Sequence, residues 1–153
     1  MFTYTPADIN DVQSLQDLND EVFVDNSKYD SDLKLDWAQS EVGKKYFTGV
    51  VENPENICLI ARDDEKPVGY IAAEPKDFDY RLSKCIEINN MGVSPKYRSK
   101  GVGSELIRRV VEKAKERGYK RIYVTSYWKN DGAVSFYEKN GFEKIDVSLE
   151  KVI

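Results

Sequence analysis

The sequence predicts an α/β fold in which a mixed central sheet carries helices on both faces. Helix-like and strand-like segments alternate along the chain, and a strand-like run at residues 85–93 leads through two glycines into an amphipathic helix. No linker, composition shift or internal repeat divides the 153 residues, of which 41% are hydrophobic. The chain can therefore bury a substantial core, and we expect a single domain spanning residues 1–153.

The first half of the chain is expected to form two helices and a β-hairpin. Apolar residues recur at helical spacing in residues 8–23, and less regularly in residues 36–51. Residues 57–62 and 68–73 are apolar and β-compatible, and the stretch 63–67 between them has the composition of a tight turn. These two strands are therefore expected to pair as a hairpin.

The second half is expected to alternate strands and helices. In order, we expect a strand at 85–93, a helix at 101–117, a strand at 121–126, a helix at 131–140 and terminal strands near 142–145 and 147–152. The helix at 101–117 has the clearest pattern, because its apolar residues share one face and Gly118 is placed to end it.

Composition and charge argue against several classes of protein. The net charge of −4 disfavours general nucleic-acid binding, because most of the surface would repel the phosphate backbone. No apolar run is long enough to span a membrane and the first residues lack a signal-peptide pattern, so we expect a cytoplasmic protein with no membrane partner. Cys58 and Cys85 are expected to be buried free thiols, and a chain without histidine is expected to hold no metal.

The turn before the predicted helix at 101–117 has the composition of a phosphate-binding site. It reads Arg98-Ser99-Lys100-Gly101-Val102-Gly103-Ser104. A helix start exposes unpaired N–H groups and the positive end of the helix dipole, and glycine lets a phosphate approach the backbone. An ordinary helix start with solvated basic residues is the alternative. We favour the anion site because strand, basic pair, glycines and helix follow in the required order.

The pattern differs from two common phosphate motifs. Leu106 stands where a dinucleotide-binding fingerprint has its third glycine, and Gly103-Ser104-Glu105 replaces the Gly-Lys-Ser/Thr of a P-loop. What remains, Arg-x-x-Gly-x-Gly after a strand, resembles the acetyl-CoA-binding core of the GNAT superfamily of N-acetyltransferases. Residues 130–142, Asn-Asp-Gly-Ala-Val-Ser-Phe-Tyr-Glu-Lys-Asn-Gly-Phe, resemble the second GNAT signature. The resemblance extends over residues 57–152 and implies the GNAT fold, whose element order matches the expected one.

The resemblance implies that acetyl-CoA is the co-substrate. Its phosphates would lie against residues 98–104, and Asn130 and Phe136 would contribute to the same site. Asn130 is also placed to cap the helix that follows, and the two roles are compatible.

The resemblance also assigns a role to the end of the strand at 85–93. The backbone of Met91, Gly92 and Val93 would pair with the pantetheine arm like an added strand, and an amide near Met91 would polarise the thioester carbonyl. The polar and small residues at 89–92 break the apolar alternation, as a β-bulge would. A weak strand is the alternative interpretation.

Without a histidine, a tyrosine is the candidate acid. Tyr137 occupies the position of the tyrosine that commonly protonates the CoA sulfur in the family. A phenol has a pKa of about 10, so it stays protonated at neutral pH and can donate. The alternative is a core tyrosine whose hydroxyl donates to a carbonyl.

Glu87 is the candidate base. It lies in an apolar strand run, where burial raises the pKa of a carboxyl group. It also precedes Arg98 by the interval at which the histone acetyltransferase branch places its catalytic glutamate. The alternatives are a glutamate paired with Lys84 or Lys100, or a water chain as base. The following strand, residues 123–127, offers only hydroxyl groups in place of the glutamate that other members carry.

These residues predict an N-acetyltransferase that moves an acetyl group from acetyl-CoA to a primary amine by direct attack in a ternary complex. A non-catalytic acyl-CoA-binding sensor or interaction module on the same fold is the alternative, as is transfer of a longer acyl group. The sequence leaves open whether the acceptor is a small molecule or a peptide. It also leaves open whether the protein is a monomer or a homodimer.

The acceptor is expected to be cationic. The segment 25–36 joins the first two helices, carries four aspartates against two lysines, and corresponds to the connection that usually lines the acceptor side in GNAT proteins. With Tyr29 it offers an acidic surface and an aromatic platform for a protonated amine. A solvated loop whose aspartates cap the second helix is the alternative, and residues 78–81 are then the next candidate for the acceptor site.

Overall fold

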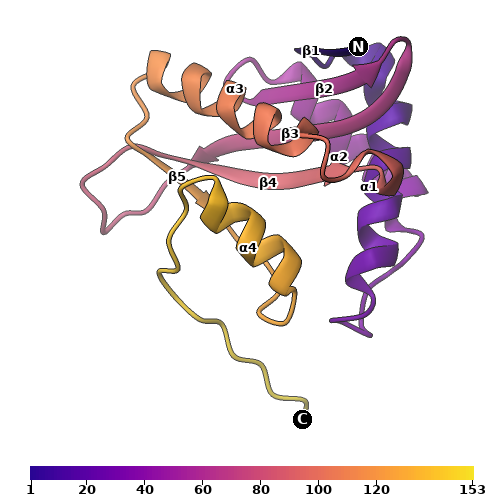
Figure 1. The fold of residues 1–153 in the computed structure, drawn as a ribbon. Helices are drawn as coiled ribbons and strands as arrows, with labels where there is room; N and C mark the ends of the chain where they lie inside the picture. Colours follow the sequence, from indigo (N-terminus) through magenta and orange to yellow (C-terminus); the bar gives the residue numbers. More distant parts are fainter.

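A five-stranded sheet in the order β1-β2-β3-β4-β5 forms the centre of the computed structural model, which describes residues 1–153 (Figure 1). Its strands are β1 (Phe2–Pro6), β2 (Ile57–Asp63), β3 (Lys66–Lys76), β4 (Cys85–Val93) and β5 (Arg121–Val124). The first four are antiparallel to their neighbours, whereas β5 lies parallel to β4. The sheet is therefore mixed, as the sequence predicts.

Helices cover both faces of this sheet. They are α1 (Val12–Asn26), α2 (Glu41–Glu52), α3 (Val102–Glu116) and α4 (Asp131–Lys139). One buried core joins α3 to the sheet through residues such as Leu106 and Ile71, and the rings of α4 pack against it. A second core lies under α1 and α2 and is centred on Phe47 and Tyr70. Figure 1 shows α1 and α2 on one side of the sheet, and α3 and α4 on the other.

Strand β4 contains the bulge that the sequence predicts. Ala72 pairs with Asn90 while the next residue of β3, Ala73, pairs with Ile88, so Asn89 is an extra residue in β4. Side chains alternate between the faces of a strand, and one extra residue shifts that alternation. As a result Glu87 and Asn90 both face α1 and α2, whereas Met91 faces α3 and α4.

Strands β4 and β5 separate along their length. They are paired from Cys85 and Arg121 to Ile88 and Val124, and no pairing follows. Beyond that point, residues 89–93 of β4 keep β3 on one side and have no strand on the other. Strand β5 ends at Val124, two residues before the predicted end at 126. We call this opening the β4–β5 gap.

The two helices of the first half begin with short 3₁₀ turns. Asp8 forms a capping box with Asp11 and starts the turn Ile9–Asp11, after which α1 begins. The second predicted helix starts later than residue 36, because Trp37–Gln39 form a separate turn and the Ser40 side chain caps α2. None of the helices has the length and apolar content that a membrane span requires.

The chain ends differ from the prediction. Strand β1 was not expected, although Phe2 and Tyr4 alternate with threonines and pair along β2. The terminal strands at 142–145 and 147–152 do not form. Their alternating apolar residues lack a neighbouring strand, so residues 145, 147 and 149 are exposed. The pattern was correct for a strand, but a strand also needs a hydrogen-bonding partner.

Candidate functional site

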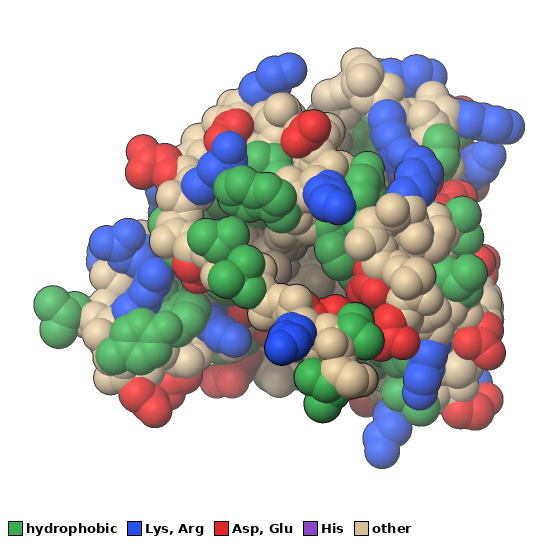
Figure 2. Space-filling model, turned by 90° about the horizontal axis from the view of Figure 1, so that it is seen from below, with side chains coloured by type: hydrophobic (Ala, Val, Ile, Leu, Met, Phe, Trp, Pro, Cys, Tyr) green, Lys and Arg blue, Asp and Glu red, His purple; other side chains and the backbone are tan.

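A pocket of about 470 Å³ opens between the start of α3 and helix α4. It is lined by Ser99, Gly101, Gly103, Ser104, Gly132, Ser135, Phe136 and Lys139. The first four come from the turn at 98–104 and the others from the 130–142 segment, so the structure brings the two sequence motifs to one place. Seen from below Figure 1, the molecule is hollowed near its centre, with apolar and charged side chains on the rim (Figure 2).

The turn before α3 leaves donors at the helix start. Gly101 adopts a left-handed conformation with φ of 83°, as does Ser99 with φ of 61°, and no side chain caps the helix. The bond from Glu105 N to Gly101 O is the first of the helix, so the N–H groups of residues 102–104 have no intrahelical acceptor. Such N–H groups suit an anion, and the turn fits the predicted phosphate role.

Gly103 also controls the packing of α4. A Cβ atom at this position would lie 3.0 Å from the Phe136 ring and 3.5 Å from the methyl carbon of Met91. The missing side chain therefore lets the ring of α4 pack directly against α3. Gly103 shapes the pocket wall as well as permitting close approach to the backbone.

The basic side chains of the turn are arranged unequally. The Arg98 guanidinium pairs with Asp25 at the end of α1, and its Nε donates to Val93 O at 3.0 Å. Lys100 lies with Nζ 5.1 Å from the centroid of the Tyr97 ring. Lys139 of α4 lines the pocket itself, and its position one turn after Phe136 was its only sequence signal. Of the basic residues in the two motifs, only Lys139 therefore lines the pocket.

Helix α4 begins as the sequence predicts. The Asn130 side chain accepts a hydrogen bond from Ala133 N at 3.0 Å and caps the helix. Gly141, with φ of 89°, follows the end of the helix. Asn130 and Gly141 thus mark the start and the end of the helix whose inner face carries Phe136 and Tyr137.

Tyr137 lies on the α4 side of the β4–β5 gap. Its hydroxyl contacts Met91 Sδ at 4.0 Å and donates to no carbonyl, unlike the core tyrosine of the alternative interpretation. The Phe136 and Phe142 rings lie 5.3 and 5.5 Å from its own ring centroid. Burial raises the pKa of Tyr137 to about 12, so the phenol is protonated at neutral pH.

Glu87 lies on the opposite face of β4. It is directly across from Glu74 of β3, and its Oε2 pairs with Lys76 Nζ at 3.3 Å. The two lysines that the sequence suggested as alternative partners of Glu87 lie elsewhere. Lys84 donates to Arg117 O, and Lys100 lies over the Tyr97 ring. Burial, followed by the charge of Glu87, raises the pKa of Glu74. The face opposite Tyr137 thus carries two facing carboxyl groups.

A buried polar network beside Glu87 was not predicted. Asn19 of α1 is fully buried and donates to Tyr70 Oη at 2.8 Å and to Asn90 Oδ1 at 2.9 Å. Asn90 in turn donates to Tyr46 Oη of α2 at 2.9 Å. Burial, and then the charge of Glu74, raises the pKa of Tyr46 to about 12. The network ties the bulged part of β4 to both helices; an asparagine on the apolar face of α1 was its only sequence signal.

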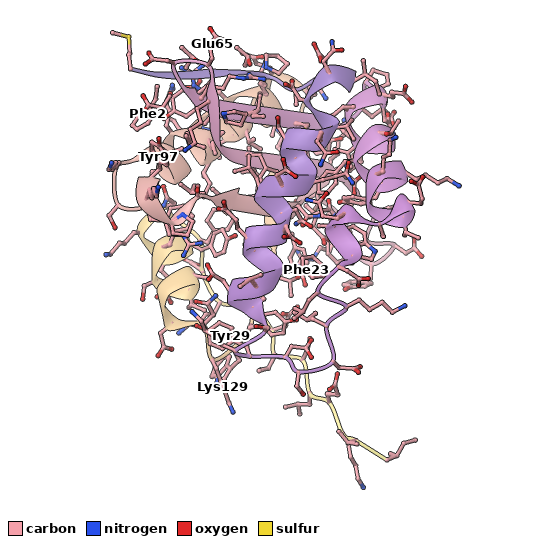
Figure 3. All side chains as sticks on the ribbon, turned by 90° about the vertical axis from the view of Figure 1, so that its right-hand side faces the viewer. Phe2, Phe23, Tyr29, Glu65, Tyr97 and Lys129 are labelled. Carbon is pink, nitrogen blue, oxygen red and sulfur yellow. The ribbon has the colours of Figure 1, made fainter.

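The segment 25–36 is held against both sides of the gap. Asp25 pairs with Arg98 next to β4, and Asp30 accepts a hydrogen bond from Tyr127 Oη at 2.8 Å beyond β5. The Tyr29 and Tyr127 rings stack with centroids 6.1 Å apart. Figure 3 shows Tyr29 at the end of α1. Two of the four aspartates are therefore engaged within the protein.

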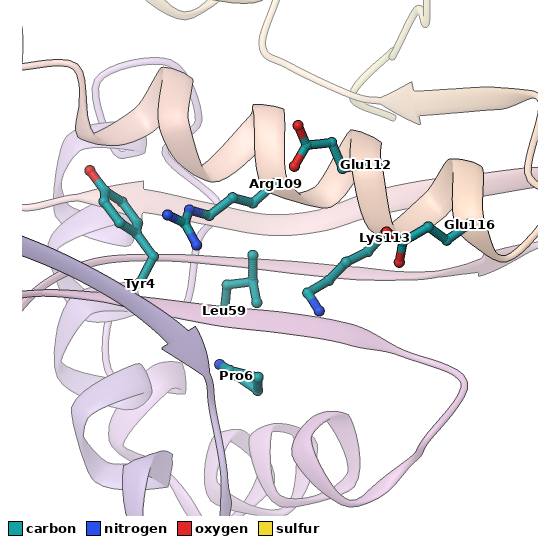
Figure 4. A pocket seen from close by; sticks show the side chains of 7 residues that line it. All are labelled: Tyr4, Pro6, Leu59, Arg109, Glu112, Lys113 and Glu116. Atoms are coloured by element: carbon teal, nitrogen blue, oxygen red, sulfur yellow. The ribbon is translucent and has the colours of Figure 1, made fainter.

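A second pocket, of about 260 Å³, lies between β1 and α3 and is separate from this site (Figure 4). Its wall includes Arg109, which bonds Glu105 at 2.7 Å and lies over the Tyr4 ring. Lys113 in this pocket is accompanied by Glu112 and Glu116. The mixed charges and the internal pairing of Arg109 give it no clear ligand preference.

Known proteins share this sequence pattern and fold. An uncharacterized N-acetyltransferase of Methanocaldococcus jannaschii is 30% identical over 103 residues, covering 67% of this chain and 46% of that protein. The chain thus spans about half the length of this relative. A mutant protein from Bacillus halodurans has the same fold, with a TM-score of 0.87 at 18% identity over 99% of both chains.

Another solved structure with this fold contains acetyl-CoA. It is a predicted acetyltransferase from Clostridium acetobutylicum, with a TM-score of 0.78 at 24% identity, covering 99% of this chain and 96% of that chain. The sequence model of the acetyltransferase (GNAT) family matches residues 12–142, which include both motifs of the pocket. With the mixed sheet, the parted strands and this match in agreement, the chain belongs to the GNAT acetyltransferase family.

Proposed function

We propose that this chain transfers an acetyl group from acetyl-CoA to the primary amine of a cationic acceptor, with both substrates bound together. One observation carries the proposal: Tyr137 and Glu87 lie on opposite faces of β4 beside the β4–β5 gap. A phenol on one side and a carboxylate on the other suit direct attack on a thioester between them. Family membership supports the transferase activity.

The pocket between α3 and α4 is the proposed acetyl-CoA site. The free N–H groups of residues 102–104, with Lys100 and Lys139 nearby, would hold the pyrophosphate. The open edge of β4 at residues 91–93 would pair with the pantetheine arm. The acetyl-CoA bound by the relative from Clostridium acetobutylicum supports this assignment.

The proposed step uses one proton donor and one proton acceptor. The neutral amine attacks the thioester carbonyl, so an N–C bond forms as the C–S bond breaks. The amine proton passes to Glu87, directly or through water, and the departing thiolate takes the proton of Tyr137. A backbone amide near Met91 would stabilise the charge on the carbonyl oxygen.

The proposal is tested by measuring CoA release from acetyl-CoA against a panel of amines, with the acetylated product identified by mass. The panel should include peptides with a free N-terminus, lysine derivatives, polyamines and aminoglycosides. Amine-dependent CoA release is the expected result. Acetyl-CoA binding without transfer to any amine would instead favour the acyl-CoA-binding module.

A further inference from the structure

Lys76 places an ammonium group between a carboxylate and an aromatic ring. Its Nζ lies 3.3 Å from Glu87 Oε2 and 5.5 Å from the centroid of the Phe78 ring. Glu87 Oε2 is screened from solvent and makes no hydrogen bond. The Glu87 side chain is 17% exposed and that of Lys76 is 42% exposed, so the ammonium covers the carboxylate from the solvent side.

The groups around this ammonium come from three strands and the β3–β4 loop. Glu87 of β4 is paired with Glu74 of β3 on one side and with Tyr123 of β5 on the other. The Phe78 ring packs edge-on against Tyr123, with centroids 5.5 Å apart, and the Arg81 guanidinium lies 4.7 Å from the Phe78 centroid. We call Glu87, Glu74, Phe78 and Tyr123 the cation slot. Carboxylates and ring faces attract the same kind of ligand, an ammonium group.

The cation slot lies where the two strands part. The Glu87 and Tyr123 pair is followed by one more pair, Ile88 and Val124, before the β4–β5 gap begins. The slot is thus beside the end of the gap that the pantetheine arm would occupy under the proposed function. The Lys76 side of this ion pair is 42% exposed and the pair includes no hydrogen bond, so another cation can displace the ammonium.

We infer that Lys76 occupies the binding position of the acceptor and that the acceptor displaces it. The ligand class is then an ammonium group on an unbranched alkyl chain, which matches a lysine side chain or an aliphatic polyamine. The ammonium binds Glu87 and the alkyl chain lies against Phe78 and Tyr123. This inference rests on the proposed function and names the acceptor class for the same site. Lys76 competes with the acceptor for the cation slot and thereby sets which amines bind there.

The test is the substitution Lys76→Met, which keeps an unbranched side chain and removes the charge. With 1,5-diaminopentane as acceptor, we expect its KM to fall on the order of fivefold, the factor that an exposed ion pair supplies. The KM for acetyl-CoA should not change. With 4-methoxyaniline, which is uncharged at neutral pH, Lys76→Met should leave the acceptor KM unchanged.

Two further variants separate the slot from a general charge effect. Lys84→Met removes a lysine at the other end of the β3–β4 connection, and the ammonium of Lys84 contacts Arg117 O and the Tyr119 ring instead. It should leave the diamine KM as it is. Phe78→Leu should raise that KM by weakening the ring contact. An unchanged or higher diamine KM in folded Lys76→Met would overturn the inference.

Binding of 1,5-diaminopentane without acetyl-CoA distinguishes this inference from the proposed function. Calorimetry should show tighter binding to Lys76→Met than to the unsubstituted chain. If no amine is acetylated yet the diamine binds more tightly to Lys76→Met, the proposed function fails and the slot stands. If acetylation occurs but neither binding nor KM responds, the slot is wrong and the proposed function stands.

Discussion

The Tyr137 hydroxyl and the Met91 sulfur are 4.0 Å apart between α4 and β4. A thioether is a weak hydrogen-bond acceptor, so this contact does not engage the phenol proton strongly. Met91 belongs to the part of β4 that has no partner strand beyond it. The hydroxyl is therefore free to donate to a group that enters the β4–β5 gap.

Tyr137→Phe should bind acetyl-CoA nearly as well as the unsubstituted chain but lose on the order of 10²-fold in kcat. The hydroxyl makes only the weak sulfur contact, so the free energy of unfolding should change by less than about 1 kcal/mol. Calorimetry, steady-state kinetics and chemical denaturation measure the three quantities. Unchanged kcat, or loss of the fold, would return Tyr137 to a packing role.

The raised pKa of Tyr137 predicts a stability loss at high pH. Below about pH 10 the phenol is protonated in both states and contributes no pH dependence. Between pH 10 and about 12 the unfolded chain releases this proton and the folded protein retains it, so the free energy of unfolding falls as pH rises. Denaturation from pH 9 to 11 should show a steeper fall for the unsubstituted chain than for Tyr137→Phe. Equal slopes would contradict the assigned pKa.

Gly103→Ala should weaken acetyl-CoA binding and destabilise the fold by about 1–3 kcal/mol, because its Cβ would meet the Phe136 ring at 3.0 Å. Gly132→Ala is the matched control in the same pocket, since its Cβ would meet only Asn130 Oδ1, at 3.7 Å. That control should be as stable as the unsubstituted chain or gain up to about 1 kcal/mol. Equal stability of the two variants would show that α4 moves aside freely.

Two aspartates of the segment 25–36 should respond differently to substitution. The backbone N–H of Asp32 and the Tyr127 hydroxyl lower the pKa of Asp30, so Asp30→Asn should loosen the segment. The Asp32 carboxylate makes no ion pair or hydrogen bond, and Asp32→Asn should raise the KM of a cationic acceptor at low ionic strength. Acetyl-CoA binding should be unaffected. Identical acceptor kinetics for Asp32→Asn at low salt would make the segment a scaffold only.

Local sequence signals were sufficient for the elements of the proposed cofactor site. The turn at 98–104, the cap at Asn130 and the bulge near Asn89 each depend on a few adjacent residues, and the structure contains all three. The two terminal strands were wrong because their pattern says nothing about whether a neighbouring strand is within reach.

Partners that are distant in sequence could not be inferred in this way. Arg98 and Asp25 are 73 residues apart and meet because α1 ends beside the turn. Glu87 was expected beside Lys84 or Lys100, yet it pairs with Lys76. That choice depends on the register of β3 against β4, which the whole sheet determines.

The extra residue in β4 reverses the face of the sheet to which each later side chain of the strand points. Without Asn89, Asn90 would point toward α3 and Met91 toward α1, which would exchange the surroundings of the two. The buried polar network would lose the hydrogen bond from Asn90 to Tyr46 of α2, and the Met91 sulfur would no longer contact Tyr137. A deletion of one residue here would therefore move the later β4 side chains to the opposite face of the sheet. A shorter or longer turn between β2 and β3 would leave the faces of these β4 side chains unchanged.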